Sequence, residues 1–303
     1  MSGPVGALRE RSRQLLVAGH VNIDRFLELP HLPEADRTVP VRSVHEALGG
    51  PAATIARQAA TRGVRTGIVS RVGEDFPVAF TAQLRAERID LAGLERVARA
   101  RSPTCYILHD RRGHQVSAMF QGPMGQAGAA KIPRALLSRY DWLHLSTGDP
   151  RFQLRLQRAA RQHGMHVAVD PAQELHYWWK PGPLRRLLEG AELLFVNRSE
   201  FDRVRALLRL RSARELLAIV PHVVVTLGSA GAVAYHRAGT EKAPGLPVRG
   251  KRQVTGAGDA FRGGFYAEWF AGAPLGECLR AGNRAAVGWM RYPQLPARAR
   301  AHR

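Results

Sequence analysis

A glycine-rich turn near the C-terminal end of the chain has the residue types needed to move a phosphoryl group. Gly256, Ala257, Gly258 and Asp259 stand in a row and precede a helical window at 260–271. Glycines let the backbone turn tightly and present bare N–H groups, and such groups at a helix N-terminus bind anions. A carboxylate beside them can accept a proton from an attacking hydroxyl while the N–H groups hold the phosphoryl group. An alternative role is structural, because an aspartate after a glycine turn is also common as a simple helix N-cap.

The elements that must position this turn follow an alternating pattern along the chain. Short apolar runs, typical of buried strands, occupy 15–19, 67–70, 142–146, 166–170, 193–197 and 222–226. Helical windows, such as 52–62 and 77–87, lie between them. This alternation predicts an α/β fold with a doubly wound, mostly parallel sheet flanked by helices. Ligands bind beyond the carboxyl ends of such strands, so we expect Asp170, Asn197 and Thr226 at the site.

Two stretches break the alternation, at about 25–44 and 104–121. They contain β-rich pieces near 25–30, 39–44, 104–109 and 115–120, and residues 110–113 (Asp-Arg-Arg-Gly) between the last two pieces are typical of a hairpin. We expect these pieces to form a small sheet that serves as a lid, inserted into a single domain spanning 1–303.

Composition narrows the functional class. Of the 303 residues, 45% are apolar, which is ordinary for a globular protein, and no window holds the 18 or so apolar residues of a membrane helix. The N-terminus lacks a secretory signal, and the two cysteines fit a reducing cytoplasm. The net charge of +20 comes mostly from arginines spread along the chain, without an aromatic-interleaved basic block. This spread argues against nucleic acid as the main partner, whereas the charge itself favours anionic ligands such as nucleotides.

Four linked motifs resemble those of the ribokinase (PfkB-type) sugar and nucleoside kinase family. They are the segment 253–265 around the glycine turn, the pair Gly49–Gly50 before a helix, an N-x-x-E motif at 197–200 and a T-x-G-x-x-G motif at 226–231. Their order and spacing extend the resemblance from about residue 15 to 292. Segments 19–24, 119–124 and 170–174 look most like archaeal-type nucleoside kinases and bacterial adenosine kinases. The resemblance implies ATP as phosphoryl donor, Mg²⁺ as cofactor and a nucleoside 5′-monophosphate as product.

On the phosphate side, the resemblance implies a role for each matching residue. Asp259 would be the base, with Gly256, Ala257 and Gly258 as the anion hole. Asn197 and Glu200 would organise Mg²⁺, Glu200 through water; by residue type alone, Asn197 could equally be a helix cap. The remaining ATP contacts would come from Thr226, Gly228, Gly231, Asn283 and Arg262. Arg262 would reach the γ-phosphate, although an exposed helix arginine is an equal alternative.

On the acceptor side, Asp24 would bind the ribose hydroxyls, because a carboxylate can accept two hydrogen bonds from a vicinal diol. Asn22, Gly49 and Gly50 would complete that contact. Gln121 and Gln173 would reach the base or the ribose, and Met124 would pack on the base. Thr54 and Asp170 complete the expected acceptor site.

Some positions depart from the family pattern and leave alternatives open. Gln253 stands where the family usually has an aspartate, which puts a K⁺ site in doubt, and Thr54 replaces an asparagine that commonly touches the substrate. The acceptor could instead be a sugar such as ribose or fructose. With the high charge, these departures also admit a nucleotide- or nucleic-acid-binding regulator without turnover, but the intact Gly258 and Asp259 argue against it. In the family, lid strands can also pair across a homodimer.

Overall fold

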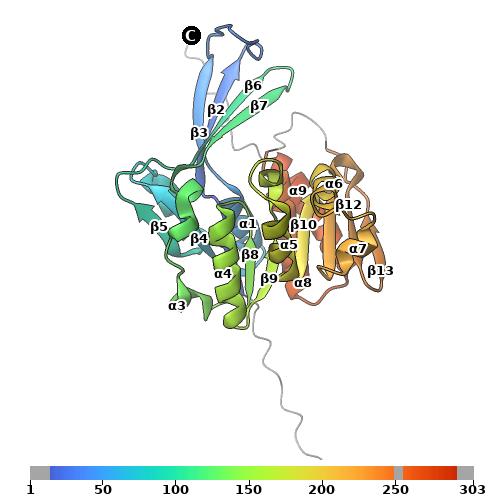
Figure 1. Cartoon of the computed structure of the whole chain (residues 1–303). Helices are drawn as coiled ribbons and strands as arrows, with labels where there is room; N and C mark the ends of the chain where they lie inside the picture. The colour runs from blue at the N-terminus through green and yellow to red at the C-terminus, as the bar shows by residue number, and fades with distance from the viewer. Residues whose placement is uncertain (1–13, 249–254, 292–303) are drawn as a thin grey trace, which may run out of the picture.

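A computed structural model describes residues 14–248 and 255–291. Within them, a nine-stranded sheet has the strand order β13-β12-β11-β10-β9-β8-β1-β4-β5 (Figure 1). Its strands from β5 to β11 run parallel, and β12 and β13 are added antiparallel. In chain order these strands are β1 (Gln14–Ala18), β4 (Arg65–Gly73), β5 (Asp90–Val97), β8 (Trp142–Leu145), β9 (His166–Val169), β10 (Leu193–Asn197), β11 (His222–Thr226), β12 (Ala232–His236) and β13 (Gly239–Ala243).

Helices cover both faces of this sheet. They are α1 (Pro51–Ala60), α2 (Val78–Ala86), α3 (Arg134–Leu137), α4 (Pro150–Gln162), α5 (Pro181–Glu189), α6 (Arg198–Leu208), α7 (Ala213–Leu217), α8 (Ala257–Phe270) and α9 (Leu275–Arg291). Three short 3₁₀ segments, η1 (Gly122–Ala129), η2 (Ala172–His176) and η3 (Gly228–Ala230), complete the described elements.

The two layers of core follow from the alternation of side chains along the central strands. On β1, Leu15 and Val17 face the core that α1, α2, α8 and α9 cover. Leu16 and Ala18 face the opposite core, against α3 to α7. Because both faces are covered, the strand is apolar at successive positions, as parallel strands buried on two sides are. The predicted doubly wound sheet is therefore confirmed.

A second sheet of four strands projects from the edge of the domain near the carboxyl ends of the parallel strands (Figure 1). It contains β2 (Asn22–Leu29), β3 (Ser43–Gly49), β6 (Thr104–Asp110) and β7 (Gln115–Phe120), in the order β3-β2-β6-β7. We call it the small sheet. Asp110 accepts the N–H groups of Arg112 and His114 at 2.9 and 3.0 Å, and Gly113 has a φ of 92°, so the β6–β7 connection is a tight hairpin turn.

Two boundaries differ from the sequence-based expectation. The strand expected at 39–44 runs instead over Ser43–Gly49, after Pro40, because a proline lacks the N–H that a strand ladder needs. The helix expected from 260 already begins at Ala257, directly after Gly256, whose left-handed φ of 81° glycine tolerates. Asp259 therefore lies in the first helical turn.

Candidate active site

A cleft of about 520 Å³ lies between the small sheet and the carboxyl ends of the parallel strands. Most of the predicted site residues line it: Asn22, Asp24, Gly50, Thr54, Gln121, Gln173, Asn197, Glu200, Thr226, Gly256, Gly258, Asp259 and Arg262. The acceptor-side and phosphate-side residues, far apart in the chain, thus share one cavity. This is the position that the topology of an open parallel sheet predicts.

The glycine turn is held from behind by a tryptophan. Trp289 on α9 donates its indole N–H to the carbonyl of Thr255 at 2.8 Å. A Cβ on Gly256 would come within 3.0 Å of the Trp289 Nε1 atom, and the φ of 81° is also unfavourable for other residues. Gly256 is therefore required both by its conformation and by the packed indole. The N–H groups of the first turn of α8 remain available for an anion.

Asp259 combines a position in the turn with an altered acidity. Burial raises the pKa of Asp259 to about 7, an effect that Arg262 opposes and Asp170 reinforces. A carboxyl with this pKa is deprotonated in about half of the molecules at neutral pH. That balance suits a general base, which must be deprotonated before the reaction and still basic enough to accept a proton near the working pH.

Arg262 is a buried member of an ion pair and does not lie exposed on its helix. Its side chain reaches Asp170 with Nε–Oδ2 and Nη2–Oδ1 distances of 2.5 and 2.8 Å, and both residues are at most 5% exposed. The alternative of a solvated helix arginine is therefore wrong. Burial lowers the pKa of Arg262, but Asp170, Asp259 and Glu200 outweigh it and keep the group charged. A Cβ on Gly258 would lie 2.8 Å from the Arg262 Nη1 atom, so the positive charge sits directly against the turn.

Asn197 and Glu200 form the start of α6. The Asn197 side chain accepts the Glu200 N–H at 2.9 Å, and the Glu200 Oε2 atom accepts the Asn197 N–H at 2.8 Å. This reciprocal capping box is the helix-start role that the residue types allowed for Asn197. It uses one carboxylate oxygen of Glu200, whose side chain still borders the cleft.

The carboxylates of the cleft suit a Mg²⁺ ion that is held mainly by phosphates and water. Among residues 14–248 and 255–291, no three His, Cys, Asp or Glu side chains gather into a metal-binding group. Mg²⁺ keeps several waters and usually takes only one or two carboxylates besides the substrate phosphates. The uncapped oxygen of Glu200 and the ionised form of Asp259 can supply such contacts, directly or through water.

Asp24 lines the same cleft from β2. Burial raises the pKa of Asp24 to about 7, a hydrogen bond from Asn22 lowers it, and the charge of Asp259 raises it further. The Asn22 amide donates to Asp24 at 2.6 Å. A Cβ on Gly49 would lie 2.2 Å from the Asp24 carboxyl carbon, and one on Gly50 would lie 2.6 Å from the Asn22 side-chain oxygen. The glycine pair therefore makes the space that these two polar side chains occupy.

Several predicted residues lie outside the cleft lining. Met124 is 2% exposed and packs beside Ser70, so its side chain belongs to the core under the cleft. Asn283 donates to the carbonyls of Ala243 and Pro244 at 3.3 and 2.9 Å, which ties α9 to the end of β13. Asp170 pairs with Arg262 behind the turn. Gly49, Ala257, Gly228 and Gly231 also fall outside the lining. Gln253 lies outside the described residues.

Other cleft residues were missed at the level of sequence. His20 bonds Thr147 at 2.7 Å through Nδ1, and burial lowers the pKa of His20 to about 4, which keeps the ring neutral. Glu174 accepts the Gly148 N–H with both carboxylate oxygens, at 2.9 and 2.8 Å. Tyr177, 57% exposed, brings an aromatic ring into the cleft. His20 and Glu174 stand inside the segments that resemble nucleoside kinases, but no signal in their spacing marks them.

Residues of β7 could have been found from strand periodicity. Gln115, Ser117 and Met119 alternate along the strand, and all three line the cleft. Side chains two residues apart point to the same face of a strand, so one face of β7 is turned to the cavity. Met119, rather than the expected Met124, is therefore the methionine that lines the cleft.

Comparison with known proteins identifies the family of the chain. A family model described as pfkB family carbohydrate kinase matches residues 12–291. A nucleoside kinase of Methanothermobacter thermautotrophicus is 32% identical over 276 residues, which cover 90% of this chain and 88% of the relative. An ATP-dependent ribose-1-phosphate kinase of Halopiger xanaduensis is 30% identical over 284 residues, 89% of each chain.

The fold has a near counterpart among solved structures. The crystal structure of the Methanocaldococcus jannaschii nucleoside kinase, described as an archaeal member of the ribokinase family, matches with a TM-score of 0.85. It is 26% identical, and the match covers 93% of each chain. Because the family model spans almost all of the sequence and the relatives match over most of their length, this protein belongs to the pfkB family of carbohydrate kinases.

Proposed function

We propose that the protein transfers the γ-phosphoryl group of ATP to the 5′-hydroxyl of a nucleoside, with Asp259 as the base. The observation that carries this proposal is the shared cleft of Asp24 and Asp259, whose charges are close enough for one to raise the pKa of the other. One carboxylate is suited to a vicinal diol and the other to the hydroxyl at the opposite end of the same ribose.

The transfer would proceed with the acceptor held between these two carboxylates. Asp259 takes the proton of the 5′-hydroxyl as its oxygen attacks the γ-phosphorus, and ADP leaves. The N–H groups from Gly256 to Gly258 and the charge of Arg262 stabilise the negative charge on the transferring group. Glu200 would hold a Mg²⁺ ion, directly or through water, and the ion would neutralise charge on the phosphate oxygens.

The cleft also has apolar surface for a nucleobase. Tyr177 and Met119 are its large, partly exposed apolar side chains on the acceptor side, 57% and 36% exposed. The amides of Gln121 and Gln173 line the same region and can hydrogen-bond a base edge. These residues favour a nucleoside, adenosine or a broader set, over a free sugar.

A sugar or sugar phosphate remains the second candidate acceptor. Asp24 would bind only the diol, which ribose shares with every ribonucleoside. The Halopiger xanaduensis relative is named an ATP-dependent ribose-1-phosphate kinase. A regulator without turnover is disfavoured by a cleft that keeps Asp24, Asp259 and the glycine turn together.

An ADP-release assay with Mg-ATP distinguishes a nucleoside acceptor, a sugar acceptor and a protein without turnover. The panel would contain adenosine, guanosine, inosine, cytidine, uridine, ribose, fructose and ribose 1-phosphate, with Asp259→Asn as control. We expect turnover on nucleosides and a loss of about 10²–10⁴ in kcat in the variant. Turnover on sugars alone would reassign the acceptor, and silence on the whole panel would reject the kinase.

Assembly and location belong to the same proposal. β7 is an exposed edge of the small sheet, and Val116 and Phe120 on it are 55% and 48% exposed. We propose that small sheets of two copies pair as a homodimer, which sedimentation of the chain and of a Val116→Lys variant would test.

Cys105 and Cys278 are free thiols, which fits the proposed cytoplasmic location. Among the described helices, none combines the length and apolar character needed to cross a membrane.

A further inference from the structure

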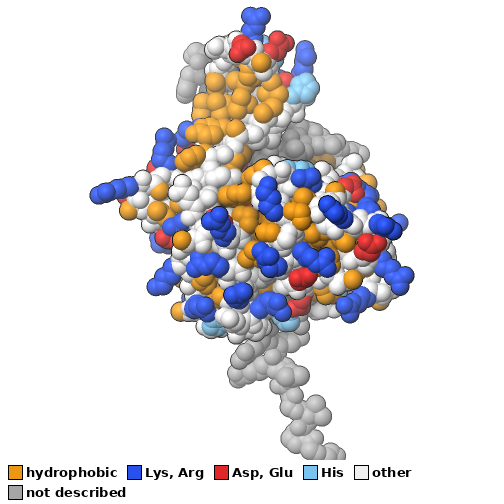
Figure 2. Space-filling view, viewed as in Figure 1, with side chains coloured by type: hydrophobic (Ala, Val, Ile, Leu, Met, Phe, Trp, Pro, Cys, Tyr) orange, Lys and Arg blue, Asp and Glu red, His pale blue; other side chains and the backbone are white. Residues whose placement is uncertain are grey.

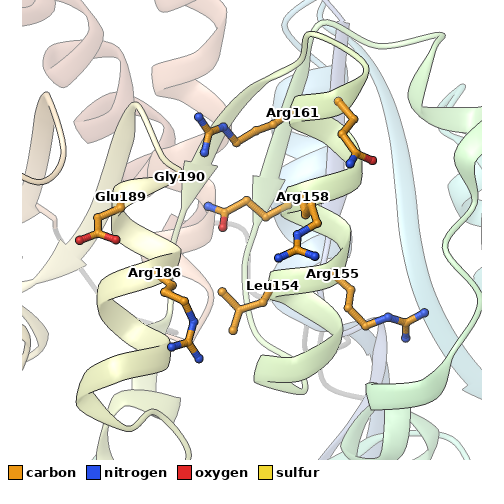
Figure 3. A pocket seen from close by; sticks show the side chains of 9 residues that line it. Leu154, Arg155, Arg158, Arg161, Arg186, Glu189 and Gly190 are labelled. Atoms are coloured by element: carbon orange, nitrogen blue, oxygen red, sulfur yellow. The ribbon is translucent and has the colours of Figure 1, made fainter.

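A second cavity lies away from the active cleft, between the outer sides of α4 and α5 (Figure 3). It measures about 680 Å³, which is within the range of small-molecule sites. Arg155, Arg158 and Arg161 on α4 and Arg186 on α5 border it, with Glu189 as the acidic lining residue. We call this cavity the α4–α5 groove. On this side of the molecule, basic side chains far outnumber acidic ones (Figure 2).

The charges of the groove are not balanced by neighbouring acids. Glu189 is engaged by Arg185, outside the lining, at 2.9 Å. Arg155 turns away and donates to the carbonyls of Gly128 and Ala130 at 2.6 and 3.0 Å. Within the described part of the chain, Arg158, Arg161 and Arg186 have no carboxylate within ion-pair distance. Gathering guanidinium groups in one groove whose one lining carboxylate is already paired costs electrostatic free energy, which a bound anion would recover.

The geometry of these three arginines suits a chain of phosphates. Arg158 and Arg161 are three residues apart and so share one face of α4, about 4.5 Å apart along the helix axis. Arg186 lines the same groove from α5, opposite α4 (Figure 3). Each guanidinium can bind a phosphate through two parallel N–H groups. Three such groups on two sides of a groove match two or three linked phosphates better than a single one.

The walls that carry the arginines are fixed. Gln157 is 4% exposed and donates to the carbonyl of Leu187 at 2.7 Å, which ties α4 to α5 under the groove. A Cβ on Gly190 would lie 2.7 Å from that same amide, so the close approach of the two helices depends on this glycine. A rigid floor lowers the ordering cost of binding.

The groove lining contains no aromatic side chain, only Leu154 as an apolar surface beside arginines, glutamines, Glu189 and Gly190. Proteins that bind single-stranded nucleic acid usually stack its bases on aromatic rings, so this lining favours phosphates over bases. We propose that the α4–α5 groove is a binding site for a short chain of two or three phosphates, inorganic or carried by a nucleotide, held by Arg158, Arg161 and Arg186. This site goes beyond the kinase function and does not depend on it.

Calorimetric titration of the full chain with tripolyphosphate tests the proposal. The test variant replaces Arg158, Arg161 and Arg186 by glutamine. The matched control replaces Arg85, Arg88 and Arg214, which are exposed elsewhere and do not border the groove, so that both variants lose the same charge. The glycine turn can also bind phosphates, but its contribution is common to all three proteins.

We expect the groove variant to lose tripolyphosphate affinity by about tenfold or more and the control by less than about threefold. Orthophosphate should bind the wild type more weakly than tripolyphosphate does. Equal affinity in all three proteins, or an equal loss in both variants, would overturn the site. A single-stranded oligonucleotide that binds more tightly than tripolyphosphate, and is lost only in the groove variant, would overturn it in favour of a nucleic-acid surface.

Two further arms complete the experiment. A difference between wild type and groove variant with ATP as well as tripolyphosphate would extend the site to nucleotide-borne chains. If the glutamine variant does not fold, lysines at the same three positions keep the charge but lose the paired N–H geometry. That variant should bind several-fold more weakly, and unchanged affinity would contradict the arginine-specific site.

Discussion

Gln115, at the start of β7, donates its side-chain amide to the hydroxyl of Thr255 at 3.0 Å. The two residues are 140 positions apart, and Thr255 directly precedes Gly256 of the glycine turn. The small sheet is thus linked to the phosphate end of the cleft by a side-chain contact, in the arrangement that a lid requires.

Replacing Gln115 by alanine should loosen this contact. We expect the acceptor KM to rise and kcat to fall, together by roughly fivefold in kcat/KM, because one neutral hydrogen bond contributes about 1 kcal/mol. Hydrogen exchange of β6 and β7, measured with acceptor and an ATP analogue, should show less protection than in the wild type. Gln83→Ala on α2, which removes a glutamine amide away from the cleft, is the control. Exchange that substrates leave unchanged in the wild type would remove the lid role.

The pair Asp170–Arg262 should set the pH at which the enzyme becomes active. Arg262 lowers the pKa of Asp259 and Asp170 raises it. Arg262→Gln should therefore move the acidic limb of kcat/KM to higher pH, and Asp170→Asn should move it to lower pH. A purely structural role would lower activity at every pH without moving the limb. Both variants leave one buried group of the pair without its partner, and we expect each to lose about 3–5 kcal/mol of stability.

Titration of Asp259 also predicts that stability falls over the pH range in which activity rises. Its pKa is raised in the folded protein, to about 7, so the folded state binds a proton more tightly than the unfolded chain between about pH 4 and 7. Unfolding free energy should therefore fall as the pH rises through this window and level off above it. Asp259→Asn should raise Tm by a few degrees at pH 8 and leave it unchanged at pH 4. An equal shift at both pH values would contradict the raised pKa.

The close approach of Gly49 to Asp24 gives a substitution specific to the acceptor. Gly49→Ala places a methyl group 2.2 Å from the position of the Asp24 carboxyl carbon, so this side chain must move. We expect the nucleoside KM to rise by about tenfold or more, with the ATP KM changed far less. Gly288→Ala on α9, where a Cβ meets no atom within 4 Å, is the matched control. Equal increases in both KM values would indicate general damage to the cleft.

The sequence allowed the sheet, its flanking helices and the position of the cleft to be predicted, because these depend on local periodicity and on topology. Asn197 and Thr226 came together at the ends of adjacent parallel strands for that reason. The pairing of Asp170 with Arg262, 92 residues later, could not be read from either segment, since it depends on how α8 packs. Met124 was assigned to the cleft and Met119 overlooked because the choice between them rests on the path of the chain after β7.

Tyr177 offers the sharpest separation of a nucleoside kinase from a sugar kinase. Its ring is 57% exposed in the cleft, and its hydroxyl accepts a hydrogen bond from the Gln121 amide at 3.3 Å. Stacking of a base on an aromatic ring contributes about 1–3 kcal/mol, so Tyr177→Ala should lower kcat/KM for a nucleoside by about 5–150-fold. Residual turnover of ribose should stay the same, because ribose has no base to stack. Tyr177→Phe keeps the ring and should retain most of the nucleoside activity. If alanine lowers ribose and nucleoside turnover equally, the ring does not contact the base, and the acceptor assignment would then rest on Asp24 and the two glutamines alone.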